Sequence, residues 1–319
     1  MQNIIFSHIY IEEAAQKFPL TNQIATRLKN SRIILVKHYK DVFNKPGQNF
    51  TAQKNSPKLI LAVRDSKYLT EGSQNCDSFG HSRFFYATQM MNCLYGCEYC
   101  YLRGMYSSAN VVAFVNVEDY MDAALREDAM YCALSYDSDL LAFELLFNYV
   151  SAWINFLNAN PSCNSLFEVR TKSANFFAVE HLTPPKNLIL SWTLSPDEII
   201  LRYEHKTPSL QKRLDCIKKA IGLGWRVRLC VDPVLHVGNW EDCYFKLADK
   251  ISGHIDIKDT EGISIGGYRI PVTFYRRIKR KNLSGLIDRL PLTELDGQMQ
   301  YAAGDDFCLH FMRRLGIIL

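Results

Sequence analysis

The stretch that decides the fold is Cys93-Leu-Tyr-Gly-Cys97-Glu-Tyr-Cys100-Tyr101, in which three cysteines are spaced C-x3-C-x2-C. Three thiolates this close together can ligate three irons of a cubane [4Fe–4S] cluster and leave the fourth iron without a protein ligand. A small molecule can chelate such an open iron. Two other interpretations are a zinc site and three buried structural thiols. Zinc normally needs four protein ligands, and the sequence contains no partner pair with suitable spacing, so the motif favours the cluster.

The same spacing is similar to the signature of the radical-SAM superfamily, and Tyr99 and Tyr101 around the third cysteine fit the usual pattern. The resemblance implies that S-adenosylmethionine (SAM) chelates the open iron through its amino and carboxylate groups. An electron from the cluster then cleaves SAM to a 5′-deoxyadenosyl radical, which abstracts a hydrogen atom from the substrate. The difficult chemistry in such a site belongs to the cofactor.

The composition is that of a cytosolic protein with a large core. The chain has 319 residues, of which 48% are hydrophobic, enough for one large domain with or without a small appendage. Its ten cysteines are scattered, and the start lacks the pattern of a secretory signal, so we expect a reducing, cytoplasmic location. No apolar run reaches about 18 residues, which predicts no membrane span. The net charge of +4 permits a polyanionic partner without requiring one.

From residue 83 onward, short apolar segments alternate with amphipathic ones, which indicates a series of βα units. Breakers such as Pro184-Pro185, Gly222 and Gly224 separate some of these segments. The predicted strands cover residues 83–89, 131–135, 165–171, 187–193, 225–231 and 261–265, and the predicted helices cover 117–125, 143–158, 208–222 and 240–250. In the N-terminal part we expect a helix over 12–29 and strands at 33–36 and 58–63.

Six βα units in series predict an α/β fold in which a parallel sheet curls into a partial (β/α)6 TIM-like barrel over residues 83–319, ending in a C-terminal extension. In such a fold the chemistry lies at the carboxyl ends of the strands. Residues 1–82 are predicted to form a small N-terminal α/β lobe. The rival is an open doubly wound sheet, which would need a phosphate-binding glycine loop, and none is apparent.

Several longer motifs resemble the spore photoproduct lyase family, radical-SAM enzymes that split a UV-induced thymine–thymine adduct in DNA. The likeness runs over roughly residues 9 to 280 and weakens toward the C-terminus. Its most specific parts are the cysteine motif with Leu102 and the Pro-x-x-x-Lys-Arg pattern that ends at Arg213. The other matching segments are Ile9–Glu12, Phe18–Leu20, Pro46–Asn49, Phe114–Asp119, Thr171-Lys172, and Asp232–His236 with Trp240-Glu241.

The resemblance implies roles for residues at the cofactor site. Cys93, Cys97 and Cys100 would ligate the cluster, and Lys172 would lie near the SAM carboxylate, where a charge-assisted contact is favourable. Further positions that the resemblance suggests are Ser191 at the SAM site, Tyr101 packed on SAM and Tyr99 near the substrate. Asp232 lies at the end of the fifth predicted strand, where the adenosine of SAM is expected, and could accept from its ribose hydroxyls; this position is not acidic in the family. Each of these side chains could instead be an ordinary core or strand-end residue.

One departure from the family concerns the cysteine that returns a hydrogen atom to the product radical. The matching position here is Tyr136. Cys132 lies four residues earlier in the predicted strand and would need a bulge to reach the site. Cys76 lies in the loop before the first predicted strand of the barrel, and Tyr136 could relay a hydrogen atom from such a thiol. An inert cysteine is the alternative for both.

Residues that could contact DNA cluster toward the C-terminal end. Arg269, Arg276, Arg277, Lys279 and Arg280 are interleaved with aromatic residues, a pattern that suits phosphate contacts but also a solvated basic helix face. A repair enzyme must also take the lesion out of the base stack. The family does so with a hairpin that carries an Arg-Tyr wedge; here Tyr301 is present, but the arginine is absent.

The sequence therefore predicts a radical-SAM carbon–carbon lyase that reverses a thymine dimer in DNA, by hydrogen abstraction followed by β-scission. Its cofactors would be a [4Fe–4S] cluster and SAM, and its partners damaged DNA and an external one-electron reductant of the flavodoxin or ferredoxin type. The first alternative is a radical-SAM paralogue that acts on another nucleotide or nucleic-acid substrate. The second is a non-catalytic Fe–S or zinc DNA-binding protein. The oligomeric state cannot be predicted from the sequence.

The cluster assignment predicts the behaviour of one variant. Cys97→Ala should lose iron binding and SAM cleavage together, because three thiolates are the minimum for this site. Iron content and 5′-deoxyadenosine production measure the two losses, and full activity in the variant would contradict the assignment.

Overall fold

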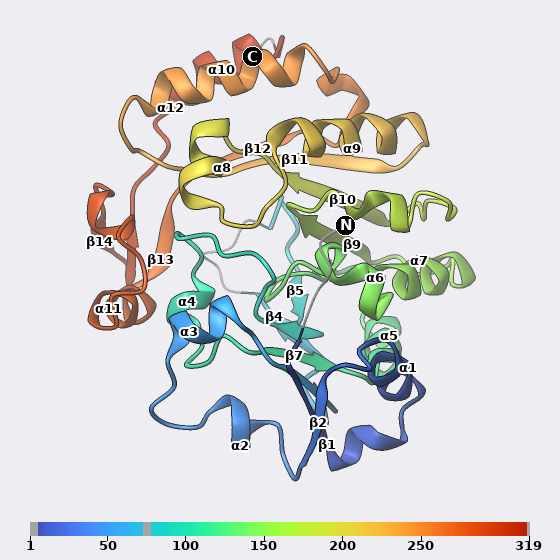
Figure 1. The fold of residues 1–319 in the computed structure, drawn as a ribbon. Helices are drawn as coiled ribbons and strands as arrows, with labels where there is room; N and C mark the ends of the chain where they lie inside the picture. The colour runs from blue at the N-terminus through green and yellow to red at the C-terminus, as the bar shows by residue number, and fades with distance from the viewer. Residues whose placement is uncertain (1–5, 73–77, 318–319) are drawn as a thin grey trace. The chain divides into compact units, whose positions relative to one another are not determined.

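The computed structural model describes residues 6–72 and 78–317, which form a mixed α/β protein (Figure 1). Contacts divide the chain into two compact units. Unit 1 consists of Met1–Leu94 and Tyr106–Val169, and unit 2 of Tyr95–Met105 and Arg170–Leu319. These units do not meet at the predicted domain boundary between residues 82 and 83. That boundary stays a prediction.

Unit 1 contains a five-stranded sheet in the order β2-β1-β3-β7-β6. Its strands are β1 (His8–Glu12), β2 (Arg32–Val36), β3 (Leu59–Ala62), β6 (Met90–Met91) and β7 (Val111–Phe114), and only β6 runs antiparallel to its neighbour. Every residue of β3 and β7 is buried, as expected for central parallel strands covered on both faces. β3, the third strand of the chain, thus pairs directly with β7, which lies beyond residue 82.

A second set of strands in unit 1 comprises β4 (Leu69–Glu71), β5 (Phe84–Ala87), β8 (Tyr131–Ala133) and the beginning of β9 (Leu166–Thr171). β5, β8 and β9 are parallel, and β4 runs antiparallel to β5. The longer helices of this unit are α1 (Pro19–Arg27), α5 (Val117–Arg126) and α7 (Tyr149–Ala159); the shorter ones are η1 (Glu13–Lys17), α2 (Lys40–Phe43), α3 (Phe50–Asn55), η2 (Leu141–Phe143) and α6 (Glu144–Phe147).

Unit 2 contains the parallel strands β10 (Leu188–Thr193), β11 (Arg226–Val234) and β12 (Ile263–Gly267), and an antiparallel sheet of β13 (Arg269–Pro271), β15 (Gln298–Gln300) and β14 (Thr293–Leu295). In Figure 1, α10 (Trp240–Ser252) lies beside α12 (Asp305–Arg314), and α11 (Val272–Arg280) lies beside α4 (Leu102–Met105). The remaining helices are η3 (Asn175–Ala178), α8 (Asp197–Tyr203), α9 (Leu210–Gly222), η4 (Ile257–Asp259) and η5 (Ile287–Arg289).

The predicted succession of strands and helices is confirmed, with three corrections. The helix expected over 143–158 is broken at Asn148, whose left-handed backbone (φ 56°) ends α6 before α7 begins. The helix expected over 12–29 is replaced by the end of β1, η1 and a shorter α1. α9 begins after Ser209, whose hydroxyl accepts from the Lys212 N–H, so Pro208 precedes the cap rather than opening the helix.

The sheets stay open in the part of the chain that the structure describes. Parallel strands connected by helices are confirmed, and the recorded strand pairs do not close either unit into a full barrel. Among the described helices, none combines the length and apolar character that a membrane span would require.

Candidate functional site

The loop that carries the cysteine motif is held by the side chain of Arg103. Its guanidinium donates to the carbonyl oxygens of Cys97 (2.8 Å), Gly96 (2.6 Å) and Leu283 (2.7 Å). Three backbone acceptors on one guanidinium fix the loop without using any thiol. Cys97 is buried, whereas Cys93 and Cys100 are partly exposed, and none of the three is in a disulfide.

The donor set fits an iron–sulfur cluster in its chemistry, because it offers three thiols from eight residues. Cys93 belongs to unit 1, and Cys97 and Cys100 to unit 2. Within the described residues, no three His, Cys, Asp or Glu side chains are arranged so that they could hold a metal ion. The ligand role of the three cysteines therefore rests on their chemistry and sequence spacing.

The cysteine loop is also hydrogen-bonded to the segment that follows α8. The N–H of Gly96 donates to the His205 carbonyl (2.9 Å), and the N–H of Glu98 donates to the Tyr203 carbonyl (2.8 Å). The side chains of Glu98 and His205 meet as well, at 3.0 Å. A Cβ added at Gly96 would lie 3.4 Å from that of His205, an ordinary van der Waals distance, so the two segments lie side by side.

Glu204, which lies between Tyr203 and His205 in the chain, forms a buried ion pair with Arg213. Both side chains are fully inaccessible, and Arg213 Nη2 lies 2.5 Å from Glu204 Oε2. Arg213 also donates to the carbonyl oxygens of Thr193 (3.0 Å) and Pro208 (3.1 Å). A buried ion pair of this kind persists only when its remaining donors and acceptors are satisfied, which these bonds achieve.

Tyr99 joins the ion pair through its phenol, which donates to Glu204 Oε1. The Ser195 hydroxyl donates to the same oxygen at 2.8 Å, and the Tyr268 hydroxyl donates to the Tyr99 carbonyl at 2.9 Å. Burial, together with the negative charge of Glu204, raises the pKa of Tyr99 well above its usual value. Tyr99 is therefore held as a neutral hydrogen-bond donor.

Lys172 lies beside this group, with its ammonium nitrogen 5.5 Å from the centroid of the Tyr99 ring, within range of a cation–π contact. Burial opposes ionisation of Glu204, but the cations of Arg213 and Lys172 and the bonds from Tyr99 and Arg213 outweigh it and lower its pKa to about 2. The predicted site residues Tyr99 and Lys172 are thus brought together with the loop of Cys97 and Cys100.

The strands β10, β11 and β12 present polar side chains on one face. The parallel register places Ser191 beside Arg228 and Cys230 beside Ser264. The hydroxyl oxygens of Ser191 and Ser264 are buried and have no hydrogen-bond partner among the described residues. Since buried polar atoms normally have partners, these two hydroxyls fit a polar ligand such as SAM. Sequence analysis predicted Ser191 but not Ser264.

Asp232, predicted to accept from ribose hydroxyls, is paired with two arginines. Its Oδ2 lies 3.5 Å from Arg269 Nη2 and 3.9 Å from Arg170 Nη1. Gly266 makes room for this group, because a Cβ there would lie 2.9 Å from Asp232 Oδ1. A ribose contact would have to share the carboxylate with both guanidinium groups, and it remains a prediction, as does packing of the partly exposed Tyr101 on SAM.

The candidate hydrogen donors differ in their surroundings. Tyr136 is partly exposed and stacks on Tyr86, with ring centroids 4.3 Å apart. Cys132 lies in β8 and is fully buried, and this burial raises the pKa of its thiol. Complete burial agrees with the inert alternative for Cys132. Cys76 lies outside the described residues.

Three of the cations predicted to bind DNA lie on α11 with partners in the protein. Arg276 pairs with Glu294 (3.7 Å), Lys279 pairs with Asp288, and Arg277 donates to the Met105 carbonyl (2.7 Å). Arg280, at the end of α11, is exposed. The positive potential of this helix is therefore partly neutralised, and its role in DNA binding stays a prediction.

Tyr301, predicted as the wedge, is anchored in unit 2. Its hydroxyl donates to the Val234 carbonyl (3.0 Å) and accepts from the N–H of His236 (3.1 Å), and its ring stacks on His236 with centroids 4.2 Å apart. Burial raises the pKa of Tyr301 to about 12. Entry of this ring into a base stack would require all of these contacts to break.

Comparison with known proteins identifies the family. A sequence model of spore photoproduct lyase matches residues 4–282. The chain belongs to the spore photoproduct lyase family. The spore photoproduct lyase of Bacillus subtilis is 25% identical over 255 residues, which cover 76% of this chain and 72% of that one. The enzyme of Clostridium acetobutylicum is 24% identical over 273 residues, covering 82% and 78%.

Solved structures of the family share the fold. A spore photoproduct lyase variant with bound AdoMet and dinucleoside spore photoproduct superposes with a TM-score of 0.78, at 17% identity, over 98% of this chain and 95% of that one. Another variant has a TM-score of 0.79 at 18% identity, with the same coverage. The α/β fold predicted from the alternation of strands and helices is thereby confirmed.

The member of the site that sequence reasoning missed is Glu204. Arg213 ends the Pro-x-x-x-Lys-Arg pattern, but nothing in the local sequence shows that a glutamate nine residues earlier is its buried partner. The pairing of these two charged side chains is visible only once α8 and α9 are folded. The sequence signal that could have indicated Glu204 is weak, because it is a single acidic residue between the α8 segment and the motif that begins at Pro208.

The buried ion pair predicts a large stability difference between two arginine variants. Arg213→Met should lower the free energy of unfolding by about 3–5 kcal/mol, because it leaves the Glu204 carboxylate buried without its cation. The matched control is Arg226→Met, which breaks a partly exposed pair with Glu261 (2.8 Å) and should cost about 1 kcal/mol or less. Urea unfolding followed by circular dichroism measures both, and equal losses would contradict the assignment.

Proposed function

We propose that the protein is a radical-SAM lyase that reverses the spore photoproduct in DNA. The family to which the chain belongs supports this activity. The observation that carries the proposal is the convergence of the cysteine loop, Tyr99 and Lys172 on the buried pair of Glu204 and Arg213. That arrangement places a motif suited to an open-iron cluster beside a cation suited to a carboxylate ligand.

Two sets of residues would hold the cofactors. Cys93, Cys97 and Cys100 would ligate the cluster, and Lys172, Ser191 and Ser264 would contact SAM. When bound, the cluster supplies an electron and SAM supplies the 5′-deoxyadenosyl radical that removes a hydrogen atom from the thymine dimer. The ammonium of Lys172 would bind the SAM carboxylate by a charge-assisted hydrogen bond.

Tyr99 would act by orienting its surroundings rather than by losing a proton. Its raised pKa and its bond to Glu204 keep the phenol neutral and fixed. The rigid ring below Lys172 limits where that ammonium can move, so SAM would meet a prearranged cation. Preorganised charges of this kind lower the cost of reorganisation when a ligand reacts.

For the return of a hydrogen atom, we propose the phenol of Tyr136. The O–H bond of Tyr136 breaks homolytically, the hydrogen atom joins the product radical, and a phenoxyl radical stays on the protein. One electron from the external reductant of the flavodoxin or ferredoxin type, with one proton from solvent, restores the phenol. The stacked ring of Tyr86 supports this role because it holds the Tyr136 ring in place.

A second candidate function is radical-SAM chemistry on a different nucleotide or nucleic-acid substrate. Two observations favour it. Tyr136 occupies the position of the family cysteine, and Tyr301 is held by Val234 and His236, contacts that would have to break before its ring could act as a wedge. A non-catalytic cluster or zinc protein that binds DNA is the remaining alternative. The proposal of a lyase that reverses the spore photoproduct also includes damaged DNA as the substrate, an external one-electron reductant and a cytoplasmic location.

The decisive assay uses anaerobically reconstituted, dithionite-reduced protein with SAM and a dinucleotide that carries the spore-type thymine adduct. Mass spectrometry should detect thymidylyl-thymidine and SAM turnover that depends on the substrate. Cleavage of SAM to 5′-deoxyadenosine without repair would favour the other substrate. An intact cluster that cleaves no SAM would favour the binding protein.

The hydrogen-return route predicts a change in product rather than in SAM cleavage. Tyr136→Phe should still cleave SAM with the dinucleotide but release aberrant thymine products, because the ring remains and only the O–H is lost. Tyr68→Phe is the control: it also removes a phenol from unit 1, one that contacts Asp119 at 3.4 Å, and should give normal product. Normal product from Tyr136→Phe would exclude Tyr136 as the donor.

A further inference from the structure

Lys54 on α3 contacts the backbone of the first cysteine of the motif. Its ammonium nitrogen donates to the Cys93 carbonyl oxygen at 2.5 Å, and both residues belong to unit 1. α3 begins after Asn49, whose side chain accepts from the Ala52 N–H at 3.0 Å. The segment Pro46–Asn49, one of the segments that resemble the family, thus ends in the cap of the helix that carries this cation.

α3 is tied to the loop before Cys93 through a buried serine. The Ser108 hydroxyl donates to the side chain of Gln53, the neighbour of Lys54 on α3, at 3.2 Å. The Asn92 side-chain amide donates to the Ser108 carbonyl at 2.9 Å. Ser108 is fully buried and therefore connects the helix to the residue directly before Cys93. These bonds keep the ammonium of Lys54 beside the first cysteine.

The segments of unit 1 around Cys93 carry positive charge only. Residues 42–64, 88–94 and 106–117 contain four lysines and arginines and no aspartate or glutamate. The nearest acidic residue to Cys93 along the chain is Glu98, which is paired with His205 at 3.0 Å. These segments therefore supply no carboxylate that could neutralise Lys54.

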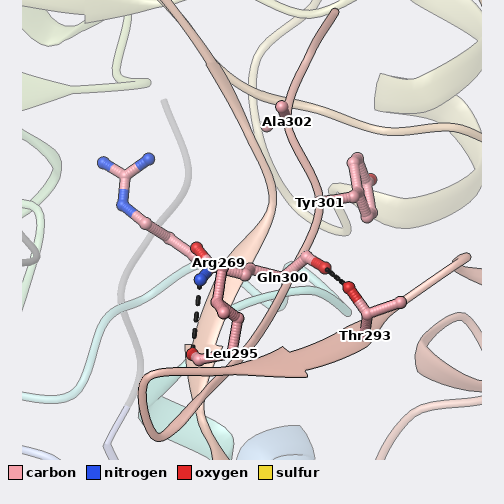
Figure 2. Close-up of a pocket in the computed structure, with 7 residues that line it drawn as sticks. Arg269, Thr293, Leu295, Gln300, Tyr301 and Ala302 are labelled. Atoms are coloured by element: carbon pink, nitrogen blue, oxygen red, sulfur yellow. Dashed lines mark hydrogen bonds between the residues drawn. The ribbon is translucent and has the colours of Figure 1, made fainter.

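Cations elsewhere in the protein are paired with carboxylates. Figure 2 shows Arg269 beside a cavity at the hairpin of β14 and β15, and its Nη2 lies 3.5 Å from Asp232 Oδ2. The field of such a pair falls off quickly with distance, because the two charges have opposite signs. The contact of Lys54 with Cys93 is of another kind. A backbone carbonyl is a neutral acceptor, so this bond leaves the full positive charge at the cysteine loop.

A positive charge at this place affects how easily a bound cluster is reduced. Reduction adds one negative charge to a cluster that three thiolates already make negative, so a nearby cation favours the reduced form. Charge, hydrogen bonds and solvent exposure around the ligands set the potentials of iron–sulfur clusters. In unit 2, Arg103 supplies a cation in the same way, through its bond to the Cys97 carbonyl at 2.8 Å.

We propose that Lys54 sets the reduction potential of the [4Fe–4S] cluster by placing a positive charge at the backbone of Cys93. The step that it favours is the transfer of one electron, without a proton, from the external reductant of the flavodoxin or ferredoxin type to the cluster. The inference rests on the proposed function, since it takes the cluster as bound. It gives α3 a role toward the cofactor rather than toward the substrate.

The test is a potentiometric titration of the full, anaerobically reconstituted protein, followed by the EPR signal of the reduced cluster. Lys54→Gln keeps a side-chain donor but removes the charge. It should lower the equilibrium constant for reduction about tenfold, or about 59 mV for one electron, while its iron content stays that of the wild type. Lys54→Arg keeps the charge and should keep the wild-type potential.

Lys37→Gln is the matched control, because it removes the same charge at the far edge of the same sheet. Lys37 is exposed and directly follows the edge strand β2, whereas Cys93 lies two residues beyond the opposite edge strand, β6. Four strand spacings, or about 19 Å, separate the two edges. Since the Debye length is about 8 Å at physiological salt, this variant should keep the wild-type potential.

The proposal is overturned if Lys54→Gln keeps the wild-type potential, or if Lys54→Arg is lowered as much, because the charge would then not be the cause. Loss of iron from Lys54→Gln would also overturn it, since the lysine would then be needed to hold the cluster. Repair of the adduct dinucleotide is assayed separately. A lowered potential in Lys54→Gln, in a protein that cleaves SAM without repair, would refute the proposed function and support the role of Lys54.

Discussion

The buried pair of Glu204 and Arg213 is the interaction on which the candidate site depends. A carboxylate and a guanidinium removed from water are stable only when both are fully paired, and here they bind each other, two backbone carbonyls, a tyrosine and a serine. The segment around Glu204 also receives the backbone of the cysteine loop. The ion pair therefore helps to hold the cysteine loop and Tyr99 in place, and Lys172 lies next to the Tyr99 ring.

The polar face of β10–β12 complements this anchor. Strands of a parallel sheet are usually rich in apolar residues, yet here Ser191 on β10 and Ser264 on the edge strand β12 place buried hydroxyls without partners among the described residues. Unsatisfied groups lower the stability of the folded protein, so a ligand that pairs with them gains binding energy. Asp232, with its two arginines, lies on β11 two residues beyond Cys230, the partner of Ser264 in the register, so unit 2 carries further polar groups on these strands.

The hairpin of unit 2 has a different character from the site around Glu204. Its contacts are hydrogen bonds between short strands, and its outer residues are exposed. Tyr301 is partly exposed and is anchored to His236 and Val234, whereas Leu295 is exposed. Tyr301, directly after β15, is therefore held by hydrogen bonds of its hydroxyl, whereas the exposed side chain of Leu295 has no polar group that could be held in this way.

The sequence by itself determined the family, the alternation of strands and helices, and the cysteine spacing, since these depend on local pattern and on short motifs. It did not determine that Glu204 pairs with Arg213, that Asp232 is shared by Arg170 and Arg269, or that Tyr301 is anchored. Asn148 likewise breaks a continuous helical pattern through its backbone conformation alone. The contacts of Asp232 and Tyr301 join segments distant in the chain, and the pairing of Glu204 with Arg213 depends on burial that the local sequence does not show. Only the tertiary structure, which sets burial and charge together, decided them.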